Sequence, residues 1–181
     1  MSVPDNLWSG GLLGPSLETV DDGTSAGPVD VPHTSEADFF VDGVGRRWVR
    51  KSLAHIGWQE LLAEIIGWFL GRELGVPVPN AAILSPGRED AAWLSAYIPH
   101  ALHWEAHHAH FVTNLDAFGA MLALDALIHN HDRHKMNILL TPGADEPELD
   151  VWAIDTGAAL VGFPDDFVAA DLSVPEKPNI A

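Results

Sequence analysis

Cysteine is absent from the sequence, which excludes disulfide bridges and metal sites built on thiolates. Long apolar runs are absent too, because no stretch approaches the roughly 18 consecutive apolar residues that a transmembrane helix needs. The first residues lack both the basic region and the long apolar region of a secretory signal peptide. These absences predict a cytoplasmic protein with no membrane partner.

Basic residues are scarce: the chain has 9 Lys and Arg against 26 Asp and Glu, and its formal net charge is −17 at pH 7. A general nucleic-acid binder needs a basic surface to displace counterions, so no nucleic-acid partner is expected. Six of the nine bases fall in two short windows, residues 46–51 and 133–135. In so acidic a chain these windows are either candidate sites for an anionic ligand or simply a solvated strand and loop.

Apolar residues make up 47% of the chain, enough for a buried core and too many for a disordered polypeptide. Turn residues and apolar periodicity predict the order of elements along the chain. We expect a leader of turns at 1–36, a hairpin at 37–52, a helix at 57–75, strands at 81–84 and 92–97, a helix at 114–128, a loop at 129–136, and strands at 137–140 and 150–154. This order predicts an α+β fold.

Both predicted helices carry apolar residues at helical spacing. In the first, the positions expected to face the core are Leu61, Leu62, Ile65, Ile66, Phe69 and Leu70. In the second, they are Leu115, Phe118, Leu122 and the run of Ala and Leu residues in this helix. Asp125 falls on that same face of the second helix, where it is either a buried carboxylate that anchors the next loop or a residue at the rim.

The loop after the second helix concentrates polar groups and reads N-H-D-R-H-K-M-N over residues 130–137. An apolar strand leaves this loop, and the returning strand ends in D-T-G at residues 155–157. Phosphoryl transfer from ATP needs an acid that orients the attacking hydroxyl, and an amide and a carboxylate that hold magnesium. Asp132, Asn137 and Asp155 supply these groups in that order. The spacing D-x-x-x-x-N is that of a kinase catalytic loop, and D-T-G stands where kinases carry D-F-G.

The pattern N-x-D-R-H-x-x-N at 130–137, together with I-D-x-G at 154–157, resembles the HipA-like kinase family and, more distantly, phosphatidylinositol 3-/4-kinase-like proteins. Upstream, W-V-R-K at 48–51 is similar to the family's nucleotide-lysine strand, and L-G-V-P-V-P at 74–79 resembles its exit from the next helix. The resemblance covers about residues 20–160.

The resemblance implies a protein-kinase-like fold with a small β-rich N-lobe that contains one helix, and a truncated helical C-lobe. After a leader at 1–36, the nucleotide-binding part would occupy residues 37–100, and the catalytic and metal-binding part residues 101–181. Within the first part, Lys51 would contact the α- and β-phosphates of ATP. Glu64 falls where the helix glutamate of the family pairs with that lysine, and Tyr97 would lie in the hinge against adenine.

The family's catalytic roles would fall on the loop and on the D-T-G segment. Asp132 would act as the catalytic base or position the acceptor hydroxyl, and Asn137 and Asp155 would bind Mg²⁺. Arg133 or His134 would stabilise the phosphoryl group during transfer. The implied activity is ATP- and magnesium-dependent phosphoryl transfer, with a Ser or Thr hydroxyl of a protein as the favoured acceptor. Lipid is the other family substrate, although an acidic surface repels anionic lipid.

Only 26 residues follow Asp155, fewer than a kinase C-lobe needs, and they contain no long amphipathic helix. The site residues therefore fit either an active small kinase or a non-catalytic nucleotide-binding module of pseudokinase or regulatory type. A partner protein that completes the C-lobe is a further expectation. Residues 163–172 are expected to form at most two helical turns.

The histidines open one further alternative. H-N-H-D-R-H at residues 129–134 resembles the H-x-H-x-D-H motif of metal-dependent hydrolases, but its aspartate stands one place early and it follows a helix rather than a strand. His103, His107 and His110 have a spacing that places imidazoles on one helix face, either as metal ligands or as a solvated cluster.

Overall fold

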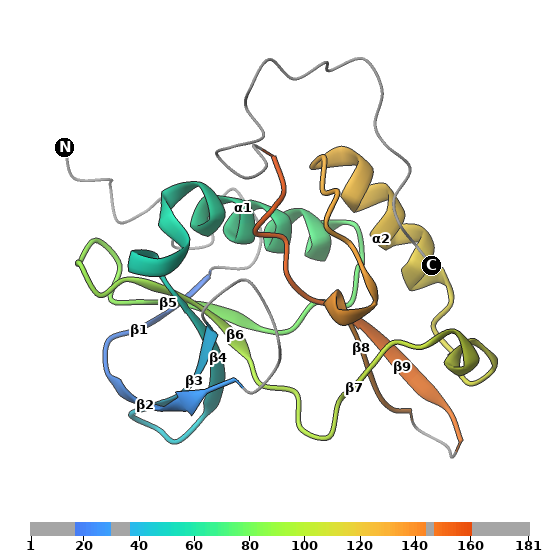
Figure 1. Cartoon of the computed structure of the whole chain (residues 1–181), viewed down its shortest axis with the longest axis horizontal. Helices are drawn as coiled ribbons and strands as arrows, with labels where there is room; N and C mark the ends of the chain where they lie inside the picture. Colours follow the sequence, from blue (N-terminus) through green and yellow to red (C-terminus); the bar gives the residue numbers. More distant parts are fainter. Residues whose placement is uncertain (1–16, 30–36, 144–146, 161–181) are drawn as a thin grey trace. The chain divides into compact units, whose positions relative to one another are not determined.

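The computed structural model describes residues 17–29, 37–143 and 147–160. The chain forms two compact units, the first within Met1–Trp58 and Asn80–Tyr97, the second within Gln59–Pro79 and Ile98–Ala181. The described residues combine two β-sheets with two α-helices and short 3-10 turns, so the expected α+β class is confirmed (Figure 1). The helical turns expected at 163–172 lie outside the described residues.

The first unit is a six-stranded sheet in the order β1-β5-β6-β4-β3-β2. Its strands are β1 (Glu18–Val20), β2 (Gly23–Pro28), β3 (Ala37–Asp42), β4 (Arg47–Ser52), β5 (Ala81–Leu84) and β6 (Ala92–Ala96). The hairpin and the two later strands predicted from the sequence are confirmed. All neighbouring strands run antiparallel except β1 and β5, which are parallel.

Residues 18–28 differ from the sequence-based expectation, which placed them in a leader of turns. β1 pairs with β5 and β2 pairs with β3, so these residues form the two edges of the sheet. Gly and Pro weaken strand propensity, but both residues are tolerated on edge strands, where one side of the backbone needs no partner. Pairing with an apolar sheet therefore overrides the local turn signal.

The turn between β3 and β4 is fixed by one buried carboxylate. Asp42 accepts hydrogen bonds from Nε1 of Trp48 at 3.0 Å and from Nε of Arg46 at 2.7 Å. Burial alone would raise the pKa of Asp42, but the hydrogen bonds from Trp48 and Arg46 outweigh burial and hold this pKa below its usual value. The hairpin that carries Lys51 is thus tied at its turn by a charged group.

Helix α1 (Leu53–Glu73) contains a break at Gly57, whose φ of 72° is outside the helical region. The predicted helix began at this break, so its long part is confirmed. Its buried residues are Leu61, Ala63, Glu64, Gly67, Trp68 and Gly71, whereas Leu62 is 53% exposed, so the expected stripe is only partly right. The packed face combines the large residues Leu61 and Trp68 with the small residues Ala63, Gly67 and Gly71.

Gly67 shows why that face is buried. A Cβ at Gly67 would lie 2.3 Å from Oγ1 of Thr156, in the segment that follows β9. No side chain larger than hydrogen fits at this distance. The missing side chain therefore lets the helix backbone lie directly against the D-T-G segment.

Helix α2 (Asp116–Leu127) packs on a different face from the one predicted. Ala117, Met121, Leu124 and Asp125 are buried, whereas Leu115 and Leu122 are 56% and 41% exposed. The expectation that Leu115 and Leu122 face the core is wrong. The buried acid Asp125 lies on the same side as Ala117, Met121 and Leu124.

The second unit contains a three-stranded antiparallel sheet of β7 (Leu102–His103), β8 (Ile138–Pro142) and β9 (Leu149–Ala153). Its core joins residues of both helices to the sheet, including Ala63, Met121, Leu124, Leu140 and Val151. The 3-10 turns η2 (Ala106–His110) and η3 (Lys135–Asn137) lie in the connections. Among the described residues, no helix has the length and apolar character to cross a lipid bilayer.

Candidate functional site

The loop after α2 and the end of β9 emerge at the same end of one hairpin. Ile138 at the start of β8 is opposite Ala153 at the end of β9. The register continues one step beyond the strands, because the amide of Ile154 donates to the carbonyl oxygen of Asn137 at 3.1 Å. Asn137 is therefore a backbone neighbour of the residue that precedes Asp155, although 18 positions separate it from Asp155 in sequence.

Arg133 lies at the centre of this arrangement and is 3% exposed. Its Nε and Nη2 atoms each donate to a carboxylate oxygen of Asp125 at 3.0 Å. Its Nη1 atom donates to the carbonyl oxygen of Asn137 at 3.0 Å and also to that of Ile154. One guanidinium thus links the helix, the loop and both strands of the hairpin.

This geometry favours a structural role for Arg133 over the expected contact with a phosphoryl group. A side chain that stabilises a transferring phosphoryl group must present free N–H donors to the ligand. The donors of Arg133 point instead into the protein, toward Asp125 and two backbone carbonyls. The structure also settles the two readings of Asp125, which is a buried carboxylate that anchors the loop and is 4% exposed.

Side-chain amides hold the rest of the loop. Nδ2 of Asn130 donates to Asp125 at 2.9 Å, and Oδ1 of Asn130 accepts from the amide of Asp132 at 3.2 Å. Nδ2 of Asn137 donates to the carbonyl oxygen of Asp132 at 2.9 Å. The buried Asn137 amide therefore uses its donor within the loop, which leaves its oxygen as the atom available to a cation. Asp132 itself is half-buried, and its carboxylate makes no hydrogen bond with any residue that the structure describes.

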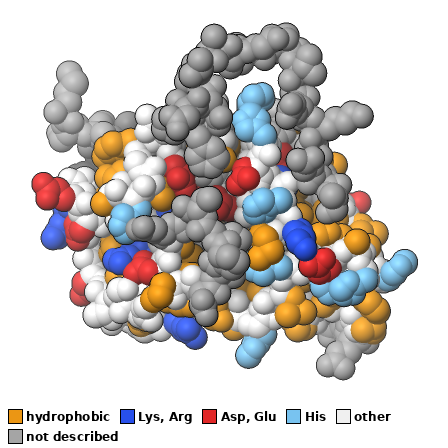
Figure 2. Space-filling model, viewed as in Figure 1, with side chains coloured by type: hydrophobic (Ala, Val, Ile, Leu, Met, Phe, Trp, Pro, Cys, Tyr) orange, Lys and Arg blue, Asp and Glu red, His pale blue; other side chains and the backbone are white. Residues whose placement is uncertain are grey.

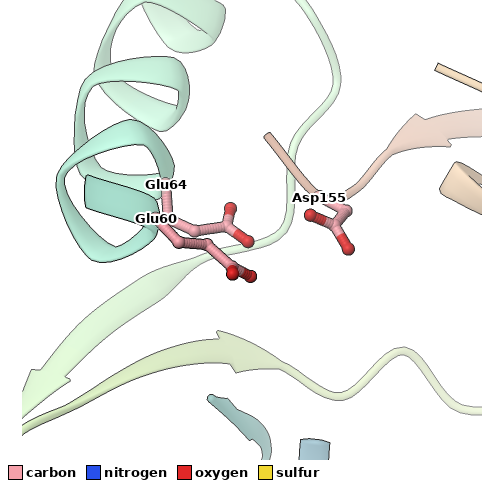
Figure 3. Close-up of side chains that lie close together, drawn as sticks. All are labelled: Glu60, Glu64 and Asp155. Atoms are coloured by element: carbon pink, nitrogen blue, oxygen red, sulfur yellow. The ribbon is translucent and has the colours of Figure 1, made fainter. Parts of the chain in front are cut away.

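Asp155 lies beside two glutamates of helix α1. The three side chains each contribute one carboxylate oxygen to a cluster in which all three atoms lie within 4.8 Å of one another: Glu60, Glu64 and Asp155 (Figure 3). Glu64 is 3% exposed, and its Oε2 atom accepts from the amide and from Oγ1 of Thr156, both at 3.2 Å. The close-up shows the two glutamates reaching from neighbouring turns of the helix toward the aspartate.

Each residue of the D-T-G segment has a distinct place in this group. Asp155 has a φ of 63°, which is unusual for a residue with a side chain, and its Oδ1 accepts from the amide of Gly157 at 3.1 Å. Thr156 bonds Glu64, and a Cβ at Gly157 would lie 2.5 Å from Cγ of Glu60. A side chain at position 157 would therefore displace Glu60 from its place beside Asp155.

The chemistry of this group suits a hard divalent cation. Three carboxylates at such distances repel one another unless protons or a cation balance their charge. Carboxylate and amide oxygens are the ligands that Mg²⁺ accepts. Of the two predicted magnesium ligands, Asp155 belongs to the group, and Asn137 is its neighbour across the hairpin. Glu60 was missed in the sequence, where its only signal is the spacing of four residues before Glu64.

The predicted nucleotide residues of the first unit lie on or next to β4 and β6, the two central strands of its sheet. Lys51 on β4 is opposite Trp93 and is 7% exposed. Tyr97 follows β6, where its amide donates to the carbonyl oxygen of Arg47 at 3.0 Å and its ring packs edge-on against Phe39. Tyr97 is the last residue of the first unit before the chain enters the second. Lys51 and Glu64 belong to different units, so their pairing stays a prediction.

Most bases of the two basic windows are used in ion pairs. Arg46 pairs with Glu18 and Asp42, Arg50 pairs with Asp38, and Lys135 pairs with Glu105 at 2.9 Å. On the face shown in Figure 2, Lys and Arg side chains are scattered, and several lie next to acidic ones. For these three bases, the structure favours a paired surface over an anion site.

The histidines take other positions. His134 precedes η3, and its carbonyl oxygen accepts from the amide of Asn137 at 2.9 Å. His107 and His108 lie in η2 with ring centroids 4.1 Å apart. Among the described residues, no histidine joins a group of three or more side chains that could hold a metal ion, which speaks against the hydrolase alternative.

Comparison with solved structures defines the class of fold. The crystal structure of CtkA, a proinflammatory kinase of Helicobacter pylori, superimposes with a TM-score of 0.57 and 14% identity, covering 83% of this chain. This chain spans 63% of the length of that kinase. The fold is therefore protein-kinase-like, with a β-rich N-terminal lobe and a second lobe reduced to few helices.

A second similar structure is the complex of Rio2 kinase from Chaetomium thermophilum with ADP/Mg²⁺ and phosphoaspartate. It has a TM-score of 0.47 and 16% identity, and covers 75% of this chain and 48% of that one. No protein-family profile matches the sequence, and no curated protein is detectably similar to it.

The Asp125–Arg133 pair generates a test of stability. Asp125→Asn leaves the guanidinium of Arg133 buried without its counter-charge, so the free energy of unfolding should fall by about 3–5 kcal/mol in urea denaturation. The control is Glu105→Gln, which breaks the exposed pair with Lys135 (both side chains 49% exposed) and should cost at most about 1 kcal/mol. Equal losses for the two variants would contradict the anchoring role of Asp125.

Proposed function

We propose that the protein is an ATP- and magnesium-dependent phosphotransferase of the HipA-like type, acting on a Ser or Thr hydroxyl of a protein. The observation that carries this proposal is the meeting of Asn137 and the residue before Asp155 at one end of the β8–β9 hairpin. Sequence motifs that are separate in the chain thereby become a single site. The protein-kinase-like fold supports the same class of reaction.

Asp155 and Asn137 would hold the magnesium ion. The fit rests on the donor set, because both offer oxygen atoms, and Glu60 adds a half-buried carboxylate within reach of Asp155. When bound, magnesium would neutralise charge on the phosphates during transfer. Glu64 bonds Thr156 and holds the D-T-G segment in place, in addition to the pairing with Lys51 that the family resemblance implies.

Asp132 would orient the acceptor hydroxyl and receive its proton. Its carboxylate is half-buried and makes no hydrogen bond with the described residues, so it is available to a substrate. His134 remains a candidate for contact with the transferring phosphoryl group. Lys51 would bind the α- and β-phosphates, and Tyr97 would lie against adenine. The predicted division into a nucleotide-binding part at 37–100 and a catalytic part at 101–181 belongs to this proposal.

The outer face of helix α2 supports the expected partner protein. Leu115, Leu122 and Leu127 are 56%, 41% and 62% exposed there, and Gly119 on the same helix has no atom within 4 Å of the place of a Cβ. An apolar helix face of this kind is typical of a surface that another polypeptide covers. We propose that a protein partner completes the C-lobe on this face.

Nucleotide binding provides the first test. ATP with Mg²⁺ should raise the melting temperature of the wild-type chain, because a ligand that binds only the native state stabilises it. Asp155→Ala should abolish the magnesium-dependent part of this shift. Asp90→Ala, which removes a largely exposed carboxylate on the first unit, should leave it intact. An unchanged melting temperature of the wild-type protein on addition of ATP and Mg²⁺ would disprove the proposal.

Phosphoryl transfer separates an active kinase from a non-catalytic nucleotide-binding module. Wild-type protein incubated with γ-labelled ATP, Mg²⁺ and a mixture of protein acceptors should transfer label. Asp132→Ala should transfer roughly 10²–10⁴-fold more slowly while binding ATP normally. Binding without any transfer by the wild type would favour the regulatory module. Transfer that survives in Asp132→Ala would exclude Asp132 as the base.

A further inference from the structure

We propose that Arg133 is a positioning residue that sets the separation between Asn137 and Asp155 and thereby the affinity for the metal ion. The inference rests on the proposed function, since it concerns the two ligands assigned there to magnesium. It adds a role that differs from direct contact with the phosphoryl group. The site thus contains a basic side chain that acts on the cation through the backbone.

The hydrogen bonds of Nη1 carry this inference. They end on the carbonyl oxygens of Asn137, just before β8, and of Ile154, just after β9. The first carbonyl belongs to one proposed ligand. The second lies in the planar peptide that also contains the amide nitrogen of Asp155. A single nitrogen atom therefore fixes a backbone group at each ligand.

The backbone of Asp155 needs such a constraint. A φ of 63° is disfavoured for an aspartate, and such a conformation persists where the surroundings hold it. The carbonyl before Asp155 is held by Arg133, and the amide after it, that of Thr156, donates to Glu64 at 3.2 Å. Loss of the first contact would free the peptide that leads into the ligand.

Asp125 gives Arg133 its orientation. The two bonds from Nε and Nη2 to one carboxylate form a fork that fixes the plane of the guanidinium and so directs Nη1 to the hairpin. Lysine carries the same charge but cannot form the fork and the two carbonyl bonds together. Arg133→Lys therefore removes the positioning geometry while it preserves the buried charge.

The experiment compares metal affinity with stability in the full chain. Mn²⁺ is titrated by electron paramagnetic resonance in the presence of a saturating non-hydrolysable ATP analogue, at a temperature where each variant is folded by circular dichroism. Arg133→Lys should bind Mn²⁺ about 10–100-fold more weakly, the usual effect of losing a group that orients metal ligands. Asp125→Asn, which retains Arg133, should also lower the affinity for Mn²⁺. It replaces Arg133→Lys in the experiment if that variant does not fold.

The control for lost stability is Leu140→Ala. Leu140 is fully buried on β8, so its truncation destabilises the same unit without touching the Arg133 contacts. This variant should bind Mn²⁺ as the wild type does. Equal weakening in Leu140→Ala and Arg133→Lys would overturn the positioning role, because general destabilisation would then explain both.

A second readout does not depend on metal. The N–H of Ile154 donates to the carbonyl oxygen of Asn137. In Arg133→Lys its hydrogen exchange should become faster than the change in global stability explains, whereas in Leu140→Ala it should change only as much as global stability does. Wild-type protein that binds no Mn²⁺ would overturn the proposed function and the metal role together. Normal Mn²⁺ binding in wild type with unchanged affinity and exchange in Arg133→Lys would overturn the positioning role alone.

Discussion

The buried ion pair between Arg133 and Asp125 is the constraint on which the second unit depends. Removing both charges from water is costly, and the cost is balanced only because the guanidinium bonds a carboxylate and two backbone carbonyls at once. The pair ties the buried face of α2 to the loop that follows it. It also determines where the loop ends and how the β8–β9 hairpin begins. Fold and candidate site share the same hydrogen bonds.

Two glutamate carboxylates of helix α1 complete the candidate metal site beside Asp155. Helix α1 approaches closely because Gly67 has no side chain, and it brings Glu60 and Glu64 beside the D-T-G segment. Arg133 holds the backbone on one side of Asp155 while the carboxylates surround its side chain. Separate contacts to the backbone and to the side chain of Asp155 suit a site that binds and releases a cation.

The sequence predicted the parts of this structure that local signals determine. Strands such as Ala81–Leu84 are apolar runs between turn residues. The loop motif is specific because phosphoryl transfer requires these residue types at this spacing. The face of α2 was predicted only in part, because apolar residues lie on several sides of the helix and the burial of Asp125 depends on Arg133 in the next loop. The role of Arg133 was missed for the same reason, since its acceptors are backbone carbonyls that no sequence pattern reveals. Glu60 becomes visible only when the helix meets Asp155.

The location of the metal tests the central claim most directly. Crystals grown with Mn²⁺ and a non-hydrolysable ATP analogue should give an anomalous difference peak bound by Asp155 and Asn137, with the triphosphate beside it. The Arg133 guanidinium should remain bonded to Asp125 and to the carbonyls of Asn137 and Ile154. A peak among the histidines of residues 103–110, or an Arg133 side chain turned toward the phosphates, would contradict the account.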